Sequence, residues 1–261
     1  GWDLVDPKVR YLDQSRIGDI LMGNPDDLRG GPPVTALFIQ NTNPMMIAPE
    51  LAKVHAGFAR EDLFTCVHEQ FMTDTAKMAD IVLPATMFVE HDDVYQGGGH
   101  QHIILGPKII EPPPGPRSNS EVVNALAKRL GLAQPAFSMS AREIVDATLK
   151  ASNRGSWDEL MQSKWIDCQI PFAQAHYLDG FAWPDKKFRF KPDWAAVLPN
   201  NDGTGKGRFG PADRVPELPD HWDVIENATP DKPFRLVTAP ARSFLNSSCL
   251  LYTSPSPRDR N

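Results

Sequence analysis

Apolar residues in the first third of the chain gather in three short runs, which polar, glycine or proline residues separate; they lie at residues 35–40, 63–67 and 81–83. The runs are rich in β-branched and aromatic side chains, as is typical of buried strands. A pattern with helical period follows the first run, after Pro49 and Glu50, and Thr73 begins a shorter helix between the last two. This alternation predicts an α/β fold with parallel strands joined by right-handed crossovers.

The second half of the predicted fold depends on helix capping. Serine followed three residues later by glutamate, the capping box, occurs three times: Ser118 with Glu121, Ser140 with Glu143, and Ser156 with Glu159. Apolar residues at helical spacing follow each pair, which predicts helices over residues 119–130, 141–150 and 157–164. The sequence predicts two further elements before these helices. One is a weak helical pattern at Ile17, Ile20 and Leu21, and the other is a short strand at 102–105.

Periodicity fades from residue 165 to residue 232, where proline, glycine and aspartate become frequent. One alternating run at 187–191 is interpreted as an edge strand. A second strand is expected at 234–238, where the sequence reads F-R-L-V-T.

Composition narrows the function. The chain has 261 residues, of which 41% are hydrophobic and 23% charged, and this is a globular composition. A net charge of −6 disfavours a sequence-independent nucleic-acid binder. No apolar stretch is long enough to span a membrane. The three cysteines are far apart and form no C-x-x-C pair, so the sequence supports neither an iron–sulfur or zinc site nor a disulfide framework.

Polar residues follow the first two strands, at the edge where α/β sheets bind ligands. The turn after the first strand contains Asn41, Asn43 and Pro44, whose amides could meet a phosphate or a base. An asparagine-rich turn is also an ordinary connection between elements. Both interpretations stay open from the residues alone.

The second strand ends in His68 and Glu69, and an acidic residue at this position is a plausible acceptor for ribose hydroxyls. Thr73 and Thr75 lie where a helix N-terminus could hold an anion. The alternative is a simple threonine cap with the glutamate facing solvent. Asp80 could bind a cofactor or tie down the loop.

The run T-D-T-A-K-M-A-D-I-V-L-P-A, from Thr73 to Ala85, resembles the T-x-T-A-x-x-A-D-[IV]-V-L-P-A signature of the molybdopterin oxidoreductases of the dimethyl sulfoxide reductase family. The family also has a strand followed by N-P, as at Asn43 and Pro44. The resemblance covers residues 8–248 and is strongest over 35–131. It implies a bis(molybdopterin guanine dinucleotide) cofactor with molybdenum or tungsten, a small-molecule substrate and a redox partner protein or subunit.

The same resemblance implies a fragment. Residues 34–150 would be the family's third, dinucleotide-binding domain, with a Rossmann-like parallel sheet flanked by helices. Residues 1–33 would end a preceding domain or form a linker, 151–232 would be an irregular connection, and 233–248 would begin a β-rich C-terminal domain. The residue that ligates the metal, and a 4Fe-4S cluster where there is one, would lie before Gly1, so no residue here is assigned as catalytic or metal-ligating.

Two segments near the C-terminus are interpreted separately. The run V-T-A-P-A-R-S-F-L-N-S-S resembles the start of the family's C-terminal domain, which contacts the cofactor; the residues that the resemblance assigns are Thr238, Arg242, Asn246 and Ser247. An arginine in such a loop can hold a phosphate bidentately. Residues 249–261 change abruptly to serine, proline and arginine, and we interpret them as a non-native tail.

A histidine-rich segment invites a metal interpretation; its residues are His91, Asp92, Asp93, His100 and His102. On a strand, however, we expect H-x-H to send the two side chains to opposite faces, which disfavours a shared metal. A glycine-rich loop with His100 near the pterin or the substrate entrance is one alternative, and a solvated loop is another.

Two rival functions remain. One is a non-catalytic electron-transfer subunit like the large iron–sulfur subunit of respiratory complex I, which shares the fold without the cofactor. The other is a doubly wound enzyme that uses NAD or another nucleotide. The second predicts a G-x-G-x-x-G turn after the first strand, and the sequence contains none.

Overall fold

The computed structural model describes residues 9–97, 99–191, 218 and 228–235. The chain divides into two compact units. Unit 1 comprises Gly1–Val67, Met72–Val82 and Arg189–Asn261, and unit 2 comprises His68–Phe71 and Leu83–Phe188. Among the described residues, no helix is long and apolar enough to cross a bilayer.

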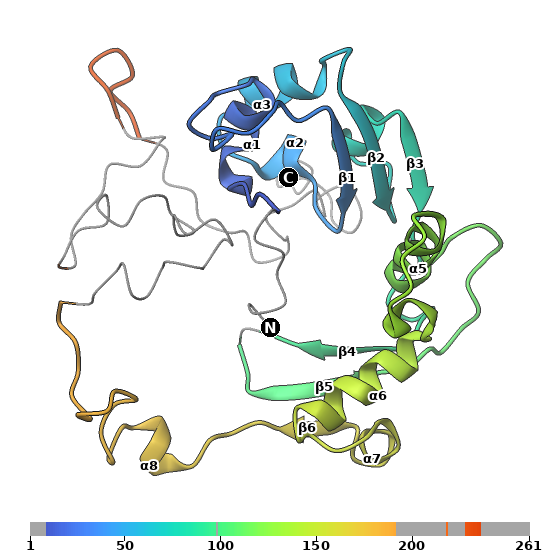
Figure 1. The fold of residues 1–261 in the computed structure, drawn as a ribbon, viewed down its shortest axis with the longest axis vertical. Coiled ribbons are helices and arrows are strands. Elements are labelled where there is room, and N and C mark those ends of the chain that lie inside the picture. The colour runs from blue at the N-terminus through green and yellow to red at the C-terminus, as the bar shows by residue number, and fades with distance from the viewer. Residues whose placement is uncertain (1–8, 98, 192–217, 219–227, 236–261) are drawn as a thin grey trace, which may run out of the picture. The chain divides into compact units, whose positions relative to one another are not determined.

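A three-stranded sheet confirms the predicted α/β fold. Its strands, β1 (Ala36–Gln40), β2 (Phe64–Glu69) and β3 (Ile81–Pro84), lie in the order β1-β2-β3 and run parallel (Figure 1). All of β1, the first four residues of β2 and the first two of β3 belong to unit 1, whereas the last two residues of β2 and of β3 belong to unit 2. The three strands lie within one or two residues of the runs that the hydrophobic pattern predicts.

Four short helices of unit 1 form its core with the sheet. They are α1 (Ile17–Leu21), α2 (Pro44–Ile47), α3 (Leu51–Phe58) and α4 (Asp74–Lys77), and the 3-10 helix η2 (Gln14–Arg16) precedes α1. Each helix contributes a buried apolar side chain to one cluster, in which Val54 is fully buried. Gly18 and Gly57 permit the close approach of α1 and α3, because a Cβ on Gly57 would lie 2.5 Å from the Leu21 Cβ.

Unit 2 contains a second sheet, which is antiparallel. Its strands are β4 (Asp93–Gln96), β5 (His102–Gly106) and β6 (Trp165–Asp167), in that order. Val94 pairs with Leu105, and Ile103 pairs with Ile166. The sequence predicts only β5 of these three strands.

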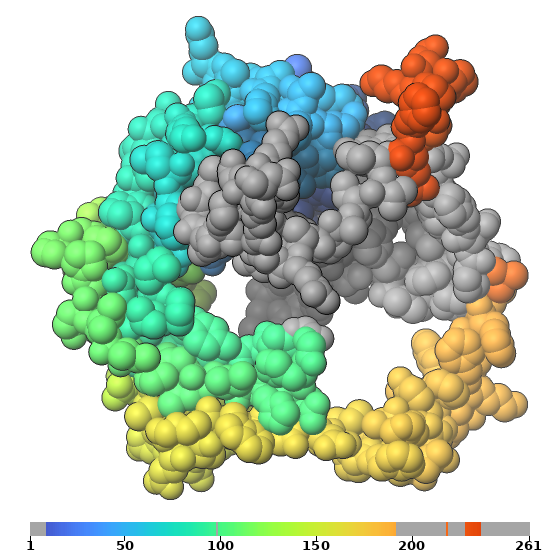
Figure 2. Space-filling view, turned by 180° about the vertical axis from the view of Figure 1, so that it is seen from behind, coloured from blue at the N-terminus to red at the C-terminus, as the bar shows by residue number. Residues whose placement is uncertain are grey.

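The capping boxes of unit 2 form as predicted, with α5 at Asn119–Arg129, α6 at Ala141–Ala151 and α7 at Trp157–Ser163. The remaining helices are η3 (Pro135–Ser138) and α8 (Phe172–Ala175). Trp157, Leu160 and Leu149 pack with Leu105 of β5 to form the core of this unit. The same segments, from β4 to α7, appear in green to yellow in the space-filling view (Figure 2).

One predicted strand is wrong. Residues 187–191 alternate in the sequence but form no strand in the structure. Alternation stabilises a strand only where a neighbouring strand pairs with it. Of the strand expected at 234–238, Phe234 and Arg235 are irregular and the other three residues lie outside the described part of the chain.

Candidate functional site

The loops after β1 and β2 are joined by a buried hydrogen-bonded bridge within unit 1. Thr75 Oγ1 donates to Asn43 Oδ1 at 2.7 Å, and the backbone N–H of Met45 donates to Thr75 Oγ1 at 3.2 Å. Asn43 is 3% exposed and Thr75 is fully buried. Both side chains therefore hold the two loops at the carboxyl edge of the sheet in a fixed arrangement. Contact of either with a cofactor stays a prediction.

Asn41 and Pro44 shape the turn between β1 and α2. Asn41 has φ of +58°, a left-handed conformation that asparagine adopts more readily than most residues. Pro44 is the first residue of α2, where its fixed φ suits the helix and its missing N–H leaves no donor unpaired. The turn thus directs the chain from the end of β1 around the edge of a pocket.

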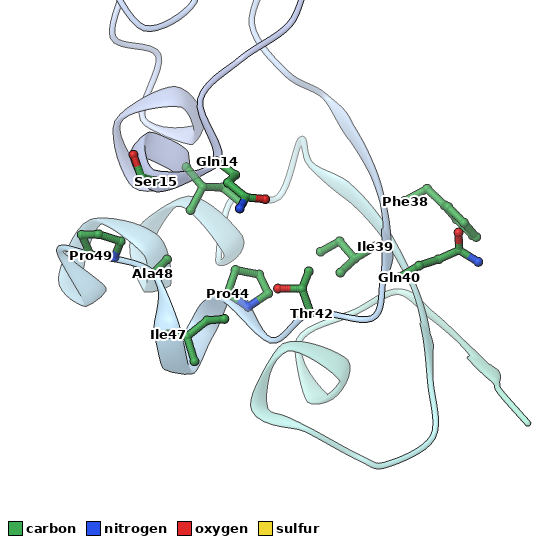
Figure 3. A pocket seen from close by; sticks show the side chains of 11 residues that line it. Gln14, Ser15, Phe38, Ile39, Gln40, Thr42, Pro44, Ile47, Ala48 and Pro49 are labelled. Carbon is green, nitrogen blue, oxygen red and sulfur yellow. The ribbon is translucent and has the colours of Figure 1, made fainter. Parts of the chain in front are cut away.

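This pocket has a volume of about 350 Å³ (Figure 3). It is lined by residues from η2 and α1 on one side and from β1, the following turn and α2 on the other: Gln14, Ser15, Ile17, Phe38, Ile39, Gln40, Thr42, Pro44, Ile47, Ala48 and Pro49. Ligand pockets of this size are mostly apolar with a few polar groups that fix orientation. Its polar side chains are two amides and two hydroxyls, and none of the lining residues is charged. Such a lining suits an uncharged planar ring better than a phosphate.

Thr73 and Asp80 also make hydrogen bonds within unit 1. Thr73 Oγ1 accepts a hydrogen bond from the N–H of Ala76 at 3.1 Å and so caps α4. This is the simple threonine cap that the sequence analysis gave as the alternative to an anion site. Asp80 Oδ2 accepts from the N–H of Thr65 at 2.7 Å. The Asp80 carboxylate therefore ties the segment before β3 to β2. Its role as a cofactor ligand, and that of Thr73, stays a prediction.

His68 and Glu69 belong to unit 2. His68 is 1% exposed, and its Nε2 lies 2.9 Å from the Arg117 carbonyl oxygen. Because a carbonyl oxygen can only accept, Nε2 carries the ring hydrogen and donates a hydrogen bond to that oxygen. Glu69 Oε1 accepts from the N–H of Gln70 at 2.7 Å. His68 therefore positions the segment around Arg117, whereas Glu69 is partly exposed at the end of β2. Binding of a ribose by Glu69 stays a prediction.

A further contact in unit 2 was not predicted. Gln70 Nε2 donates to the Thr86 carbonyl at 2.8 Å, and Thr86 Oγ1 lies 2.8 Å from His91 Nδ1. These bonds join the loop that carries Glu69 to the segment after β3. Because Gln70 and His91 are 21 positions apart in the sequence, no local pattern indicates the link.

The histidine-rich segment contains no metal centre among the described residues, since no three of their His, Cys, Asp or Glu side chains form a group able to hold a metal ion. The ring centroids of His100 and His102 are 5.7 Å apart. The expectation that the two side chains point to opposite faces of a strand is therefore wrong. The premise itself was mistaken, because residues two positions apart on a strand share a face. His100 in any case precedes β5, which begins at His102.

The four predicted residues near the C-terminus, Thr238, Arg242, Asn246 and Ser247, lie outside the described residues. Their contact with a cofactor stays a prediction.

Comparisons with known proteins show which family this chain resembles. Residues 29–129 match the model of the molybdopterin oxidoreductase family. The probable oxidoreductase YoaE of Bacillus subtilis is 34% identical over 245 residues, which cover 92% of this chain and 32% of YoaE. Formate dehydrogenase H of Escherichia coli is 33% identical over 101 residues, which cover 38% of this chain and 13% of that protein.

The fold has a counterpart among solved structures. Acetylene hydratase from Pelobacter acetylenicus superposes with a TM-score of 0.53 at 22% identity, covering 66% of this chain and 23% of the hydratase. This likeness shows that the two proteins share an α/β fold. Residues 29–129 thus match a molybdopterin oxidoreductase domain, and the chain is similar to oxidoreductases of this family. It spans about a third of the length of YoaE.

Proposed function

We propose that this chain is part of a molybdenum or tungsten oxidoreductase and holds the guanine dinucleotide end of a bis(molybdopterin guanine dinucleotide) cofactor. The observation that carries the proposal is the pocket beside the Asn43–Thr75 bridge. When bound, the metal of such a cofactor supplies two-electron redox chemistry, as oxygen-atom transfer or as transfer of a proton and two electrons. The substrate, the redox partner and the iron–sulfur cluster belong to the proposal for the full-length protein.

The lining of the pocket fits the nucleoside end of the cofactor. Gln14 carries an amide, which can both donate to and accept from the edge of a base, and Thr42 adds a hydroxyl. Ile17 and Ile47 supply apolar surface against which a planar ring can lie. The chain's own task in this proposal is to bind and orient the cofactor. The Asn43–Thr75 bridge keeps the pocket wall in place without touching the reacting atoms.

Nucleotide binding tests this part of the proposal. We expect GMP to bind the 261-residue chain weakly, as saturation-transfer NMR can detect, and to bind better than CMP because a purine covers more apolar surface. Gln14→Leu should weaken binding, since it removes an amide from the pocket. Gln169→Leu is the matched control, because Gln169 is exposed in unit 2 and does not line the pocket. Equal GMP signals for the wild type and Gln14→Leu would contradict the assignment.

The same measurement separates the rival functions. A non-catalytic electron-transfer subunit that has lost the cofactor has no use for a nucleotide pocket, so it predicts no GMP binding. A NAD-dependent enzyme predicts stronger binding of NAD than of GMP.

A second experiment tests whether the chain is a fragment. Because the family's metal ligand would lie outside these residues, we expect anaerobic expression with molybdate to give a product without metal and without oxidoreductase activity. A molybdenum-loaded, active 261-residue product would overturn the fragment part of the proposal.

A further inference from the structure

Two stretches of the pocket lining are each followed by a charged residue. The first stretch is Gln14 and Ser15 of η2, and Arg16 comes next in the chain (Figure 3). The second stretch ends at Pro49, and Glu50 comes next. Arg16 Nη1 donates to Glu50 Oε2 at 3.4 Å. This bond therefore joins two parts of the lining that are 34 positions apart in the sequence.

Arg16 and Glu50 belong to a closed network of ion pairs within unit 1. Asp19 Oδ2 lies 2.6 Å from Arg16 Nη2, and Asp19 Oδ1 accepts from Lys53 Nζ at 2.8 Å. Lys53 Nζ in turn lies 2.7 Å from Glu50 Oε1, which closes the ring. Asp27 accepts from Arg16 Nε and Nη2 at 3.2 Å and 3.1 Å. A guanidinium held in this way by three carboxylates has little freedom to turn.

Partial burial distinguishes this network from an ordinary surface ion pair. Asp19 is 7% exposed, and burial alone would raise the pKa of its carboxyl. The hydrogen bond from Lys53 and the charge of Arg16 oppose this effect, and the pKa of Asp19 lies below its ordinary value. The attraction within the network thus outweighs the loss of hydration at this carboxylate. Partly buried pairs are also screened less by salt than exposed ones.

The backbone of Glu50 is strained. Its φ is +55°, in the left-handed region, where glycine or asparagine is the usual residue. Strain of this kind persists where the surrounding structure imposes it, and it is concentrated at binding sites. Since a glutamate occupies a position that glycine would fill without strain, the carboxylate has a role that offsets this cost. Its described partners are Arg16 and Lys53.

We propose that Arg16 and Glu50 form a positioning clamp, which holds the pocket lining at Ser15 and Pro49 in the arrangement that a nucleoside needs. The inference rests on the proposed function, in which this pocket binds the guanosine end of the cofactor. Neither charged side chain lines the pocket, so the clamp acts through the residues next to it. A pocket that is already in place spares the ligand the cost of ordering its walls. The clamp thus adds affinity without contact with the ligand.

The variant Glu50→Asn separates the carboxylate from the backbone conformation. Asparagine adopts the left-handed region more readily than glutamate, and its shorter side chain lacks the carboxylate. We expect a urea midpoint no lower than that of the wild type, because relief of strain offsets the loss of partly exposed ion pairs. The dissociation constant for GMP in saturation-transfer NMR titrations should nevertheless rise roughly threefold or more, since fewer molecules have the competent pocket.

Lys164→Asn is the matched control. Lys164 is also charged, has φ of +68° and lies in unit 2, so the substitution should leave GMP binding unchanged. An unchanged GMP affinity in Glu50→Asn would overturn the proposal. A loss of affinity that only accompanies a lower urea midpoint would indicate a structural role, and it would overturn the proposal as well.

A double-mutant cycle tests whether the two residues act as a pair. Arg16→Gln should weaken GMP binding in the wild type and have no further effect in Glu50→Asn, since both substitutions remove the same bond. Equal losses in the two backgrounds would contradict the clamp. If Arg16→Gln does not fold, the comparison of Glu50→Asn with the wild type decides alone.

Hydrogen exchange tests the clamp without any ligand. The Ala48 N–H donates to the Pro44 carbonyl at 3.0 Å, next to Pro49 in the pocket lining. Release of the clamp in Glu50→Asn should accelerate exchange of this amide roughly threefold or more. If the wild type binds no GMP, the cofactor assignment fails, and an unchanged Ala48 exchange rate then overturns the clamp too. Equal GMP binding by the wild type and Glu50→Asn overturns the clamp alone.

Discussion

The substitution Thr75→Val removes one hydroxyl from the buried bridge and keeps nearly the same volume. It leaves the Met45 N–H without the acceptor that lies 3.2 Å away, and it takes from Asn43 Oδ1 its donor at 2.7 Å. Leaving a buried polar group unpaired costs about 1–3 kcal/mol. Asn43 Oδ1 keeps the weaker Thr75 N–H contact at 3.4 Å, so we expect a total loss of roughly 2–4 kcal/mol of unfolding free energy.

Thr75→Ser is the partner variant, because it keeps the hydroxyl and loses one methyl group. Its expected cost is about 1 kcal/mol. Thr148→Val is the matched control on the exposed side of α6, and its expected effect lies within about 0.5 kcal/mol.

Urea unfolding followed by circular dichroism gives the free energies. Hydrogen exchange of the amides of residues 36–67 and 72–82 assigns the loss to unit 1. The reasoning fails if Thr75→Val is as stable as the wild type, or if Thr75→Ser is the less stable of the two Thr75 variants.

Three further predictions concern unit 2. Leu160→Ala should cost about 2–5 kcal/mol of unfolding free energy in urea titrations, because Leu160 is 1% exposed within the unit's core; a loss below that of Thr148→Val would contradict the packing. Ser140→Ala should lower stability by about 1 kcal/mol and fray the start of α6 in hydrogen exchange, since it removes one half of a capping box. The Ser118 N–H donates to Glu121 Oε2 at 2.7 Å and holds the pKa of that carboxyl below 4.5. The stabilisation from Glu121 is therefore present above the unfolded pKa and is lost as the pH falls through the lower folded pKa. Glu121→Gln should flatten this part of the profile of unfolding free energy against pH, below about pH 5.

Elements with local signals were predictable. The three capping boxes place both partners within one turn, so Ser118, Ser140 and Ser156 mark the starts of α5, α6 and α7 without tertiary information. The strands β4 and β6 carry no such signal. β6 has three residues, and it is a strand because it pairs with β5 some 60 positions earlier.

The sequence predicted where the candidate site lies in the fold but not which residues contact one another there. Turn residues after β1 and β2 locate the carboxyl edge of the sheet, and the pocket lies beside the first turn. The bond between Asn43 and Thr75 joins residues 32 positions apart, so the sequence cannot distinguish a buried bridge from a pair of cofactor ligands. The same holds for Asp80, which precedes β3 and whose partner Thr65 lies on β2.

Because the pocket lining is uncharged, ionic strength can distinguish two contributions to cofactor affinity, the attraction of charged groups and the burial of the base. Coulombic attraction between exposed charges is screened within about 10 Å at 0.1 M salt, whereas burial of an apolar ring is not weakened by added salt. Because none of the pocket's lining residues is charged, guanosine and GMP should compete for it almost equally. Any steep dependence of cofactor retention on salt would then originate from phosphate contacts elsewhere in the full-length enzyme.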